Sequence, residues 1–104
     1  MVKIIIKKNK NIIQEIIIEG HAKYADLGQD IVCASISSIA TTTINGILSI
    51  YPSGINYEYV NESLMIKILE EEDNIYKLID NMIILFKELE DDYKENISII
   101  IKEV

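Results

Sequence analysis

Two isoleucine-rich runs near the N-terminus are separated by a short polar stretch. Residues 2–7 and 12–19 are rich in β-branched side chains, which favour strands, and the intervening KNKN sequence has the length of a hairpin turn. Strict alternation in the second run would place Ile12, Gln14, Ile16 and Ile18 on one face and Ile13, Glu15, Ile17 and Glu19 on the other. The pattern predicts an antiparallel hairpin in a sheet with one drier and one wetter face.

From Asp30 the spacing of apolar residues becomes helical. Small or apolar side chains recur every three or four residues, at Val32, Ile36, Ile39, Ala40, Thr43, Ile47 and Ile50. Asp30 is a favoured N-cap type and Pro52 cannot continue a helix, so we predict a helix of about twenty residues between them. Residues 20–29 show neither periodicity and contain Gly20 and Gly28, which predicts a loop.

The second half of the chain shows the patterns of another hairpin, a helix and a last strand. Residues 55–60 and 64–69 alternate again around a turn at Asn61-Glu62, and the acidic run 70–73 opens a helix with one apolar stripe. Residues 97–102 form a last strand. The order ββαββαβ predicts an α+β fold, with a five-stranded, mainly antiparallel sheet and two helices in a single domain over residues 1–104.

Charge is distributed unevenly along the chain. The net charge is -7, but residues 1–51 hold five lysines against four acids, and residues 52–104 hold five lysines against thirteen. Binding to nucleic acid normally needs a clustered basic surface, so we expect no direct nucleic-acid contact. A basic partner would instead be attracted to the second half.

Composition and motifs also bear on the cell compartment, on membrane segments and on metal or nucleotide sites. A single cysteine and the absence of a signal-like N-terminus favour a reducing cytoplasm. No uninterrupted apolar run approaches the ~20 residues that span a bilayer, so we expect no membrane segment. The chain contains no GxGxxG, P-loop, CxxC or HExxH motif, so we expect no metal and no cofactor.

Cys33 is the one candidate nucleophile of the thiol class. A cysteine nucleophile reacts as the thiolate, and both a helix N-terminus and a nearby imidazole favour that form. If Asp30 caps the helix, Cys33 is its third residue and lies in the first turn. His21, the single histidine, follows the second strand, so the loop 20–29 can return it to the same sheet edge. The spacing permits a Cys/His pair.

Each of these residues also has a structural explanation. A lone cysteine near a helix start is most often a small buried hydrophobe, and a lone histidine beside glycine is usually a loop residue. Asp30 is sufficiently explained as an N-cap, and Ser37 as a small packing residue. Tyr57 and Tyr59 are better explained as cover for a sheet face than as ligand-binding residues. Residue types alone leave both explanations open.

The sequence GHAKYADLGQDIVCA at residues 20–34, followed by Ser37, resembles the signature of the ribosomal-processing cysteine protease family, Prp. The GHA, YA, G and DIVCA segments fall at the spacing of that family, with serine one helical turn after cysteine. The predicted element order fits the family fold over the rest of the chain. Residues 55–104 match in pattern only.

This resemblance implies a homodimeric cytoplasmic endopeptidase that needs no cofactor. Its substrate would be large-subunit ribosomal protein twenty-seven, from which it removes a short N-terminal extension during ribosome assembly. By matching position, Cys33 would be the nucleophile and His21 the base that activates it. Substrates of the family carry apolar and aromatic residues before the cut, so we expect an apolar groove beside the loop.

The remaining motif positions have less defined roles. The resemblance gives Asp30 and Ser37 supporting roles and makes Gly20 and Gly28 hinges of a loop that orders around the substrate. It identifies no group that orients His21. The alternative is a noncatalytic ribosome-assembly factor that binds a basic ribosomal protein through its acidic half and uses Cys33 for packing only.

Overall fold

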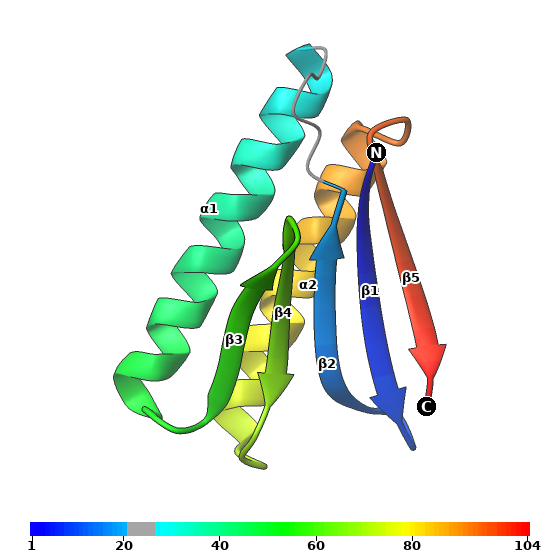
Figure 1. Cartoon of the computed structure of the whole chain (residues 1–104). Coiled ribbons are helices and arrows are strands. Elements are labelled where there is room, and N and C mark those ends of the chain that lie inside the picture. Colours follow the sequence, from blue (N-terminus) through cyan, green and yellow to red (C-terminus); the bar gives the residue numbers. More distant parts are fainter. Residues whose placement is uncertain (21–26) are drawn as a thin grey trace.

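The computed structural model describes residues 1–20 and 27–104 (Figure 1). The elements are β1 (Val2–Asn9), β2 (Ile12–Glu19), α1 (Leu27–Ile50), β3 (Ile55–Val60), β4 (Ser63–Ile68), α2 (Asp73–Asp92) and β5 (Ile97–Glu103). This order confirms the predicted ββαββαβ sequence of elements.

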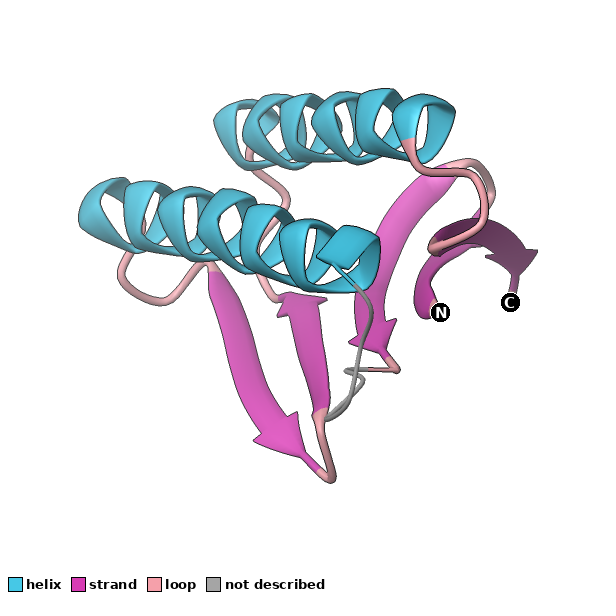
Figure 2. Ribbon diagram, turned by 90° about the horizontal axis from the view of Figure 1, so that it is seen from above, coloured by secondary structure: helices cyan, strands magenta, loops and turns pink. Residues whose placement is uncertain are grey.

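The five strands form one sheet in the order β3-β4-β2-β1-β5. Only β1 and β5 run parallel, because α2 carries the chain back across the sheet before β5 begins. Both helices lie on one face of the sheet, as Figure 2 shows from above. The predicted α+β class is therefore confirmed, with a core between one helical layer and one face of the sheet.

The first hairpin turns more tightly than its four polar residues suggested. Lys10 and Asn11 both have positive φ, 51° and 65°, as a two-residue type I′ turn requires. The register then shifts: Lys7 pairs with Glu15, but Lys8 pairs with Ile13. This bulge turns Ile13 into the core at 7% exposure and leaves Ile12 at 45%, so the predicted strict alternation of β2 is wrong at its start.

The second hairpin forms as predicted. Asn61 and Glu62 have φ values of 49° and 68° and connect β3 directly to β4. Strand β4 begins at Ser63, one residue before the expected start. Leu64 and Ile66 of β4 are buried beneath the helices, and Met65 between them lies on the open face of the sheet.

Helix α2 is the strongly amphipathic element that the apolar stripe predicted. Glu72 is its N-cap residue, and five side chains on one face are buried: Ile75, Ile79, Met82, Ile83 and Phe86. They pack against strand residues such as Ile4 and Ile16, which are completely buried. The packed stripe fixes the position of α2 on the sheet.

Helix α1 begins at Leu27, three residues before the predicted start at Asp30. The sequence signal was Asp30, which is of a type favoured as an N-cap, but the helix extends past it toward the N-terminus. Residues 31–50 of α1 also have the length and mean hydropathy of a helix that could span a bilayer. The polar serines and threonines within this segment interrupt its apolar runs, so the sequence pattern did not indicate it. Val32, Ile36 and Ile47 are buried in the hydrophobic core, so one face of α1 packs within the folded domain.

Candidate functional site

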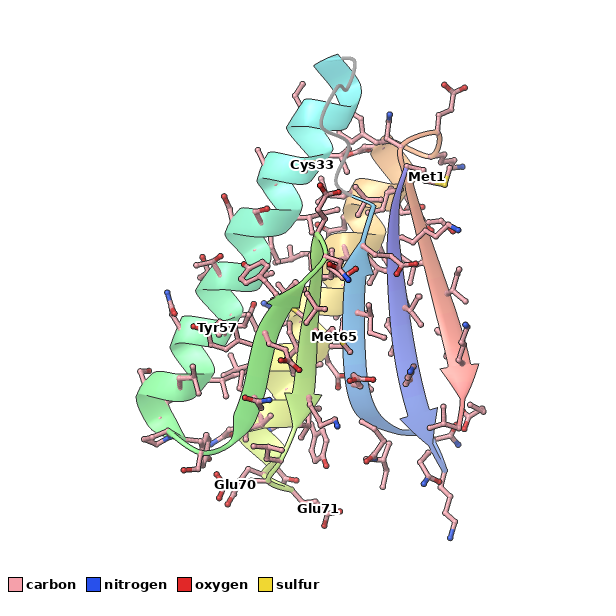
Figure 3. All side chains as sticks on the ribbon, in the orientation of Figure 1. Met1, Cys33, Tyr57, Met65, Glu70 and Glu71 are labelled. Carbon is pink, nitrogen blue, oxygen red and sulfur yellow. The ribbon has the colours of Figure 1, made fainter. Side chains whose placement is uncertain are left out.

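Cys33 lies on α1 near the end of the molecule where that helix begins (Figure 3). Its side chain is partly buried and packs against the hydrophobic core, and it is a thiol rather than half of a disulfide. The neighbouring Val32 and Ile36 are buried at 0% and 2% exposure and hold this part of α1 on the sheet. The sulfur is thus carried by a rigid helix at the edge of the core.

The predicted placement of Cys33 in the first helical turn is wrong. Because α1 begins at Leu27, Cys33 is its seventh residue and lies about 9 Å along the axis from the helix start. The unsatisfied N–H groups belong to the first four residues, and the favourable field of a helix end falls off within one turn. The helix N-terminus therefore contributes little to stabilising a thiolate at Cys33.

The same start changes the placement of two other predicted residues. Asp30 lies within α1, so its backbone is not at the N-cap position that the sequence suggested. Gly28 also lies within α1 and not in the predicted loop. The hinge role of Gly28 and the supporting role of Asp30 stay predictions.

Ser37 follows Cys33 by one helical turn and is exposed. Residues four apart on a helix lie on the same side, so the serine hydroxyl and the thiol share one flank of α1. The exposure of Ser37 contradicts its explanation as a packing residue.

His21 lies outside the described residues, so its predicted pairing with Cys33 stays a prediction. The described chain stops at Gly20, directly after β2, and resumes at Leu27 at the start of α1. Figure 1 shows the end of β2 and the start of α1 at the same end of the molecule. The fold thus brings the residue before His21 and the helix that carries Cys33 to a common end.

Gly20 has a structural requirement of its own. Its φ is +92°, and a Cβ at this position would overlap the carbonyl oxygen of Met1. A side chain is therefore disfavoured both by the backbone conformation and by the close approach of the first residue. Glycine here fixes how the chain leaves β2 just before His21.

The two tyrosines of β3 are exposed on the helix-facing side of the sheet. Tyr57 and Tyr59 are 43% and 65% exposed, although they pair with the buried residues Ile66 and Leu64 of β4. Figure 3 shows Tyr57 on the side of β3 that faces α1. Both rings nevertheless lie on the helix-facing side of the sheet, so their explanation as cover for a sheet face stays a prediction.

A surface groove of about 510 Å³ runs between the two helices. Ile39 and Leu89 contribute apolar surface, while Glu88 and Asp92 contribute carboxylates. A second hollow, of about 530 Å³, lies at the start of α2 and includes Tyr76, whose pKa is raised by burial and by the nearby negative charge of Glu71. The acidic second half of the chain thus presents carboxylates at both ends of α2.

No metal-binding group emerges from the part of the chain that is described. Residues 1–20 and 27–104 contain no cluster of three histidine, cysteine or acidic side chains placed to hold an ion. Near the start of α1 the described chain carries the thiol of Cys33 and the hydroxyl of Ser37 on the same flank of the helix.

A family model and a curated relative both match this chain and carry the same family name. The model of the family described as cysteine protease Prp matches residues 1–98. The ribosomal processing cysteine protease Prp of Staphylococcus aureus is 27% identical over 90 residues, which cover 84% of this chain and 85% of that protein.

Two solved structures share the fold closely. A crystal structure of an essential ribosomal processing protease Prp from S. aureus with a substrate peptide has a TM-score of 0.90 and 24% identity, covering 98% of this chain and 100% of the other. A second, with a covalently linked product peptide, has a TM-score of 0.86 at the same identity and coverage. At this identity the likeness shows the fold.

Proposed function

The chain belongs to the cysteine protease Prp family, and we propose that it removes the N-terminal extension of large-subunit ribosomal protein twenty-seven. The observation that carries the proposal is the family match over residues 1–98, which contains the segment with Cys33 and His21. The relatives are named as ribosomal processing proteases, and the fold follows theirs from β1 to β5.

In the proposed reaction the Cys33 sulfur attacks the carbonyl carbon of the scissile bond. His21 takes the thiol proton and later gives it to the departing amine of the mature protein, leaving the extension as a thioester on Cys33. Water then attacks the thioester, with His21 again as base, and releases the extension as a carboxylate. The covalently linked product peptide in the S. aureus relative supports a mechanism of this class.

His21 has to supply most of the activation in this scheme. The seventh position of Cys33 in α1 removes the helix end as the main source of thiolate stabilisation. An imidazole within hydrogen-bond reach both removes the proton and leaves a positive charge beside the sulfur. Asp30 and Ser37 are proposed as supporting residues, and Gly20 and Gly28 as hinges of the segment between β2 and α1.

We also propose that the protein works as a cytoplasmic homodimer. The exposed side of α1 is suited to contact with a second copy, because residues 31–50 contain no charged side chain. Ser38, Thr41, Thr42 and Asn45 are exposed there, so close approach of two such helices would bury no unpaired charge. Sedimentation of the purified chain tests this part of the proposal.

The direct test mixes the protein with the extended ribosomal protein from the same genome and measures the product masses. We expect two products whose masses sum to the substrate plus one water, from a single cut. Cys33→Ala should give no products, and Ser35→Ala, a small change on the same helix, should cleave normally. Tight binding without cleavage by the wild-type chain would instead favour the noncatalytic assembly factor.

A further inference from the structure

The two edges of the sheet differ in whether their backbone groups are satisfied within the chain. On β5 the N–H of Ile99 donates to Oε2 of Glu90 at 2.9 Å, so a side chain from α2 occupies an outward-facing donor. This internal partner occupies one outward donor of β5 and hinders the addition of another strand there. The other edge of the sheet is β3.

The turn of the second hairpin determines which backbone groups of β3 point outward. Val60 pairs with Ser63 across a two-residue turn, so this pair exchanges both of its hydrogen bonds. The bonding alternates along the strand, which leaves the N–H and C=O of Tyr57 and Tyr59 pointing away from β4. Within the part of the chain that the structure describes, no backbone group outside the strand pairing bonds to either residue.

These outward groups are next to exposed aromatic surface. The rings of Tyr57 and Tyr59 lie on the helix side of the sheet and are 43% and 65% exposed. Strand β3 runs toward the end of the molecule where α1 begins, and Figure 3 shows Cys33 at that end. An extended peptide paired with β3 would therefore leave the edge close to the thiol.

The opposite face of β3 carries a carboxylate that favours a basic neighbour. Glu58 lies on the open side of the sheet and pairs with the uncharged Met65 of β4, while Lys67 on the same face pairs with Asn56. In the described chain the one ion pair joins Lys7 to Glu15, on other strands. Oppositely charged side chains on adjacent strands attract each other, so a lysine or arginine fits the position beside Glu58 in an added strand.

We propose that the edge of β3 binds the substrate by strand addition, as a sixth strand of the sheet. Alternate substrate residues then exchange backbone hydrogen bonds with Tyr57 and Tyr59 and contact the two rings, while a basic residue lies beside Glu58. This mode gives affinity through the main chain and selectivity through alternate side chains. The inference rests on the proposed protease function and specifies how the same site selects its substrate.

A scan of N-methylated peptides tests the proposal. Single N-methyl groups are placed in turn along a peptide that spans the cut, and both kcat/KM with the wild type and affinity for Cys33→Ala are measured. We expect losses of about threefold to tenfold at every second residue on one side of the cut and little loss between them. Equal losses at neighbouring positions, or none, would overturn strand addition.

Measuring turnover by the wild type and affinity for Cys33→Ala distinguishes failure of strand addition from failure of the protease function. Alternating affinity without any turnover by the wild type would retain strand addition and reject the protease. Turnover without alternation in either readout would retain the protease and reject strand addition.

Variants of β3 test the same edge from the protein side. Tyr59→Pro removes one outward N–H together with the ring and leaves the pairing to β4 in place, whereas Tyr59→Ala removes the ring alone. Peptide binding should therefore be weaker for Tyr59→Pro than for Tyr59→Ala by a similar factor, about threefold to tenfold. Glu58→Lys should reverse a preference of about twofold to fivefold for lysine over glutamate at the facing peptide position. Glu71→Lys makes the same charge change at the end of the molecule away from Cys33 in Figure 3. It is the matched control and should leave the preference unchanged. An unchanged preference in Glu58→Lys would contradict the proposed register.

Discussion

The α-carbon of Gly20 lies so close to the carbonyl oxygen of Met1 that no side chain fits between them. Since the φ of Gly20 is also +92°, two independent effects exclude other residues from the position just before His21. A segment that orders around a substrate would thus start from a fixed point, set by the first residue of the chain.

Gly20→Ala should therefore lower the free energy of unfolding. The strained backbone alone costs about 1–3 kcal/mol, and the displaced Met1 carbonyl adds to it. Denaturant unfolding of the variant and the wild type measures the difference. A stability within about 0.5 kcal/mol of the wild type would show that the chain can shift at this point and that Gly20 acts through mobility instead.

Gly46→Ala should have the opposite effect. Gly46 lies inside α1, and a Cβ there would meet nothing within 4 Å outside its own helix. The substitution should stabilise the domain by about 0.5–1 kcal/mol, because alanine loses less backbone entropy in a helix. Thermal unfolding checks this, and a lower melting temperature would show that a second copy or another partner needs the close approach at this position.

The sequence predicted the elements well because their patterns are local. Alternation and stripes of apolar residues identified both hairpins and α2, and the second hairpin turns at Asn61 and Glu62 as predicted. The bulge in β2 could not be predicted, because it depends on how Lys8 pairs with Ile13 across the hairpin. A register shift of this kind is a property of two strands together.

The candidate site was less accessible to local reasoning. The motif located Cys33, but its electrostatic environment depended on where α1 begins, and the N-cap preference of Asp30 indicated a start three residues too late. The exposure of Tyr57 and Tyr59 followed from the place of β3 at the sheet edge, which is a property of strand order. Pairwise spacing along the chain cannot supply either fact.

His21→Ala should leave the fold intact and suppress the alkylation of Cys33 at neutral pH. With the thiol at the seventh helical position, we propose the imidazole as its main source of activation, so cleavage should also fall by about 100-fold or more. Rates of reaction with iodoacetamide across a pH series measure the thiolate directly. If the variant thiol still reacted at the wild-type rate at neutral pH, another group would have to activate it.

Electrostatic attraction should assist the whole substrate more than a short peptide. Ribosomal proteins are generally basic, and residues 52–104 carry a net charge of -8. Exposed charges are screened over ~8 Å at physiological ionic strength, and this attraction acts mainly on association. We expect kcat/KM for the whole protein to fall as salt rises, with a much smaller fall for a neutral peptide spanning the cut.

Two groups of acidic residues at different places on the molecule allow the source of the salt effect to be identified. Glu88 and Asp92 lie in the groove between the helices, while Figure 3 shows Glu70 and Glu71 at the end away from Cys33. Replacing the first pair by Gln and Asn should reduce the salt dependence more than replacing the second pair by Gln. Equal salt dependence for whole protein and peptide would mean that the acidic half does not recruit the substrate.

The proposed reaction requires Cys33 to form a covalent bond to the extension during turnover. Acid quenching of the wild-type protein in the first turnovers with the extended ribosomal protein, followed by peptide mapping by mass, measures this bond. We expect an adduct with the mass of the extension less one water, located on Cys33, absent from Cys33→Ala and lost as the reaction finishes. Cleavage at the normal rate by a folded Cys33→Ala protein, with no adduct on the wild type, would contradict it.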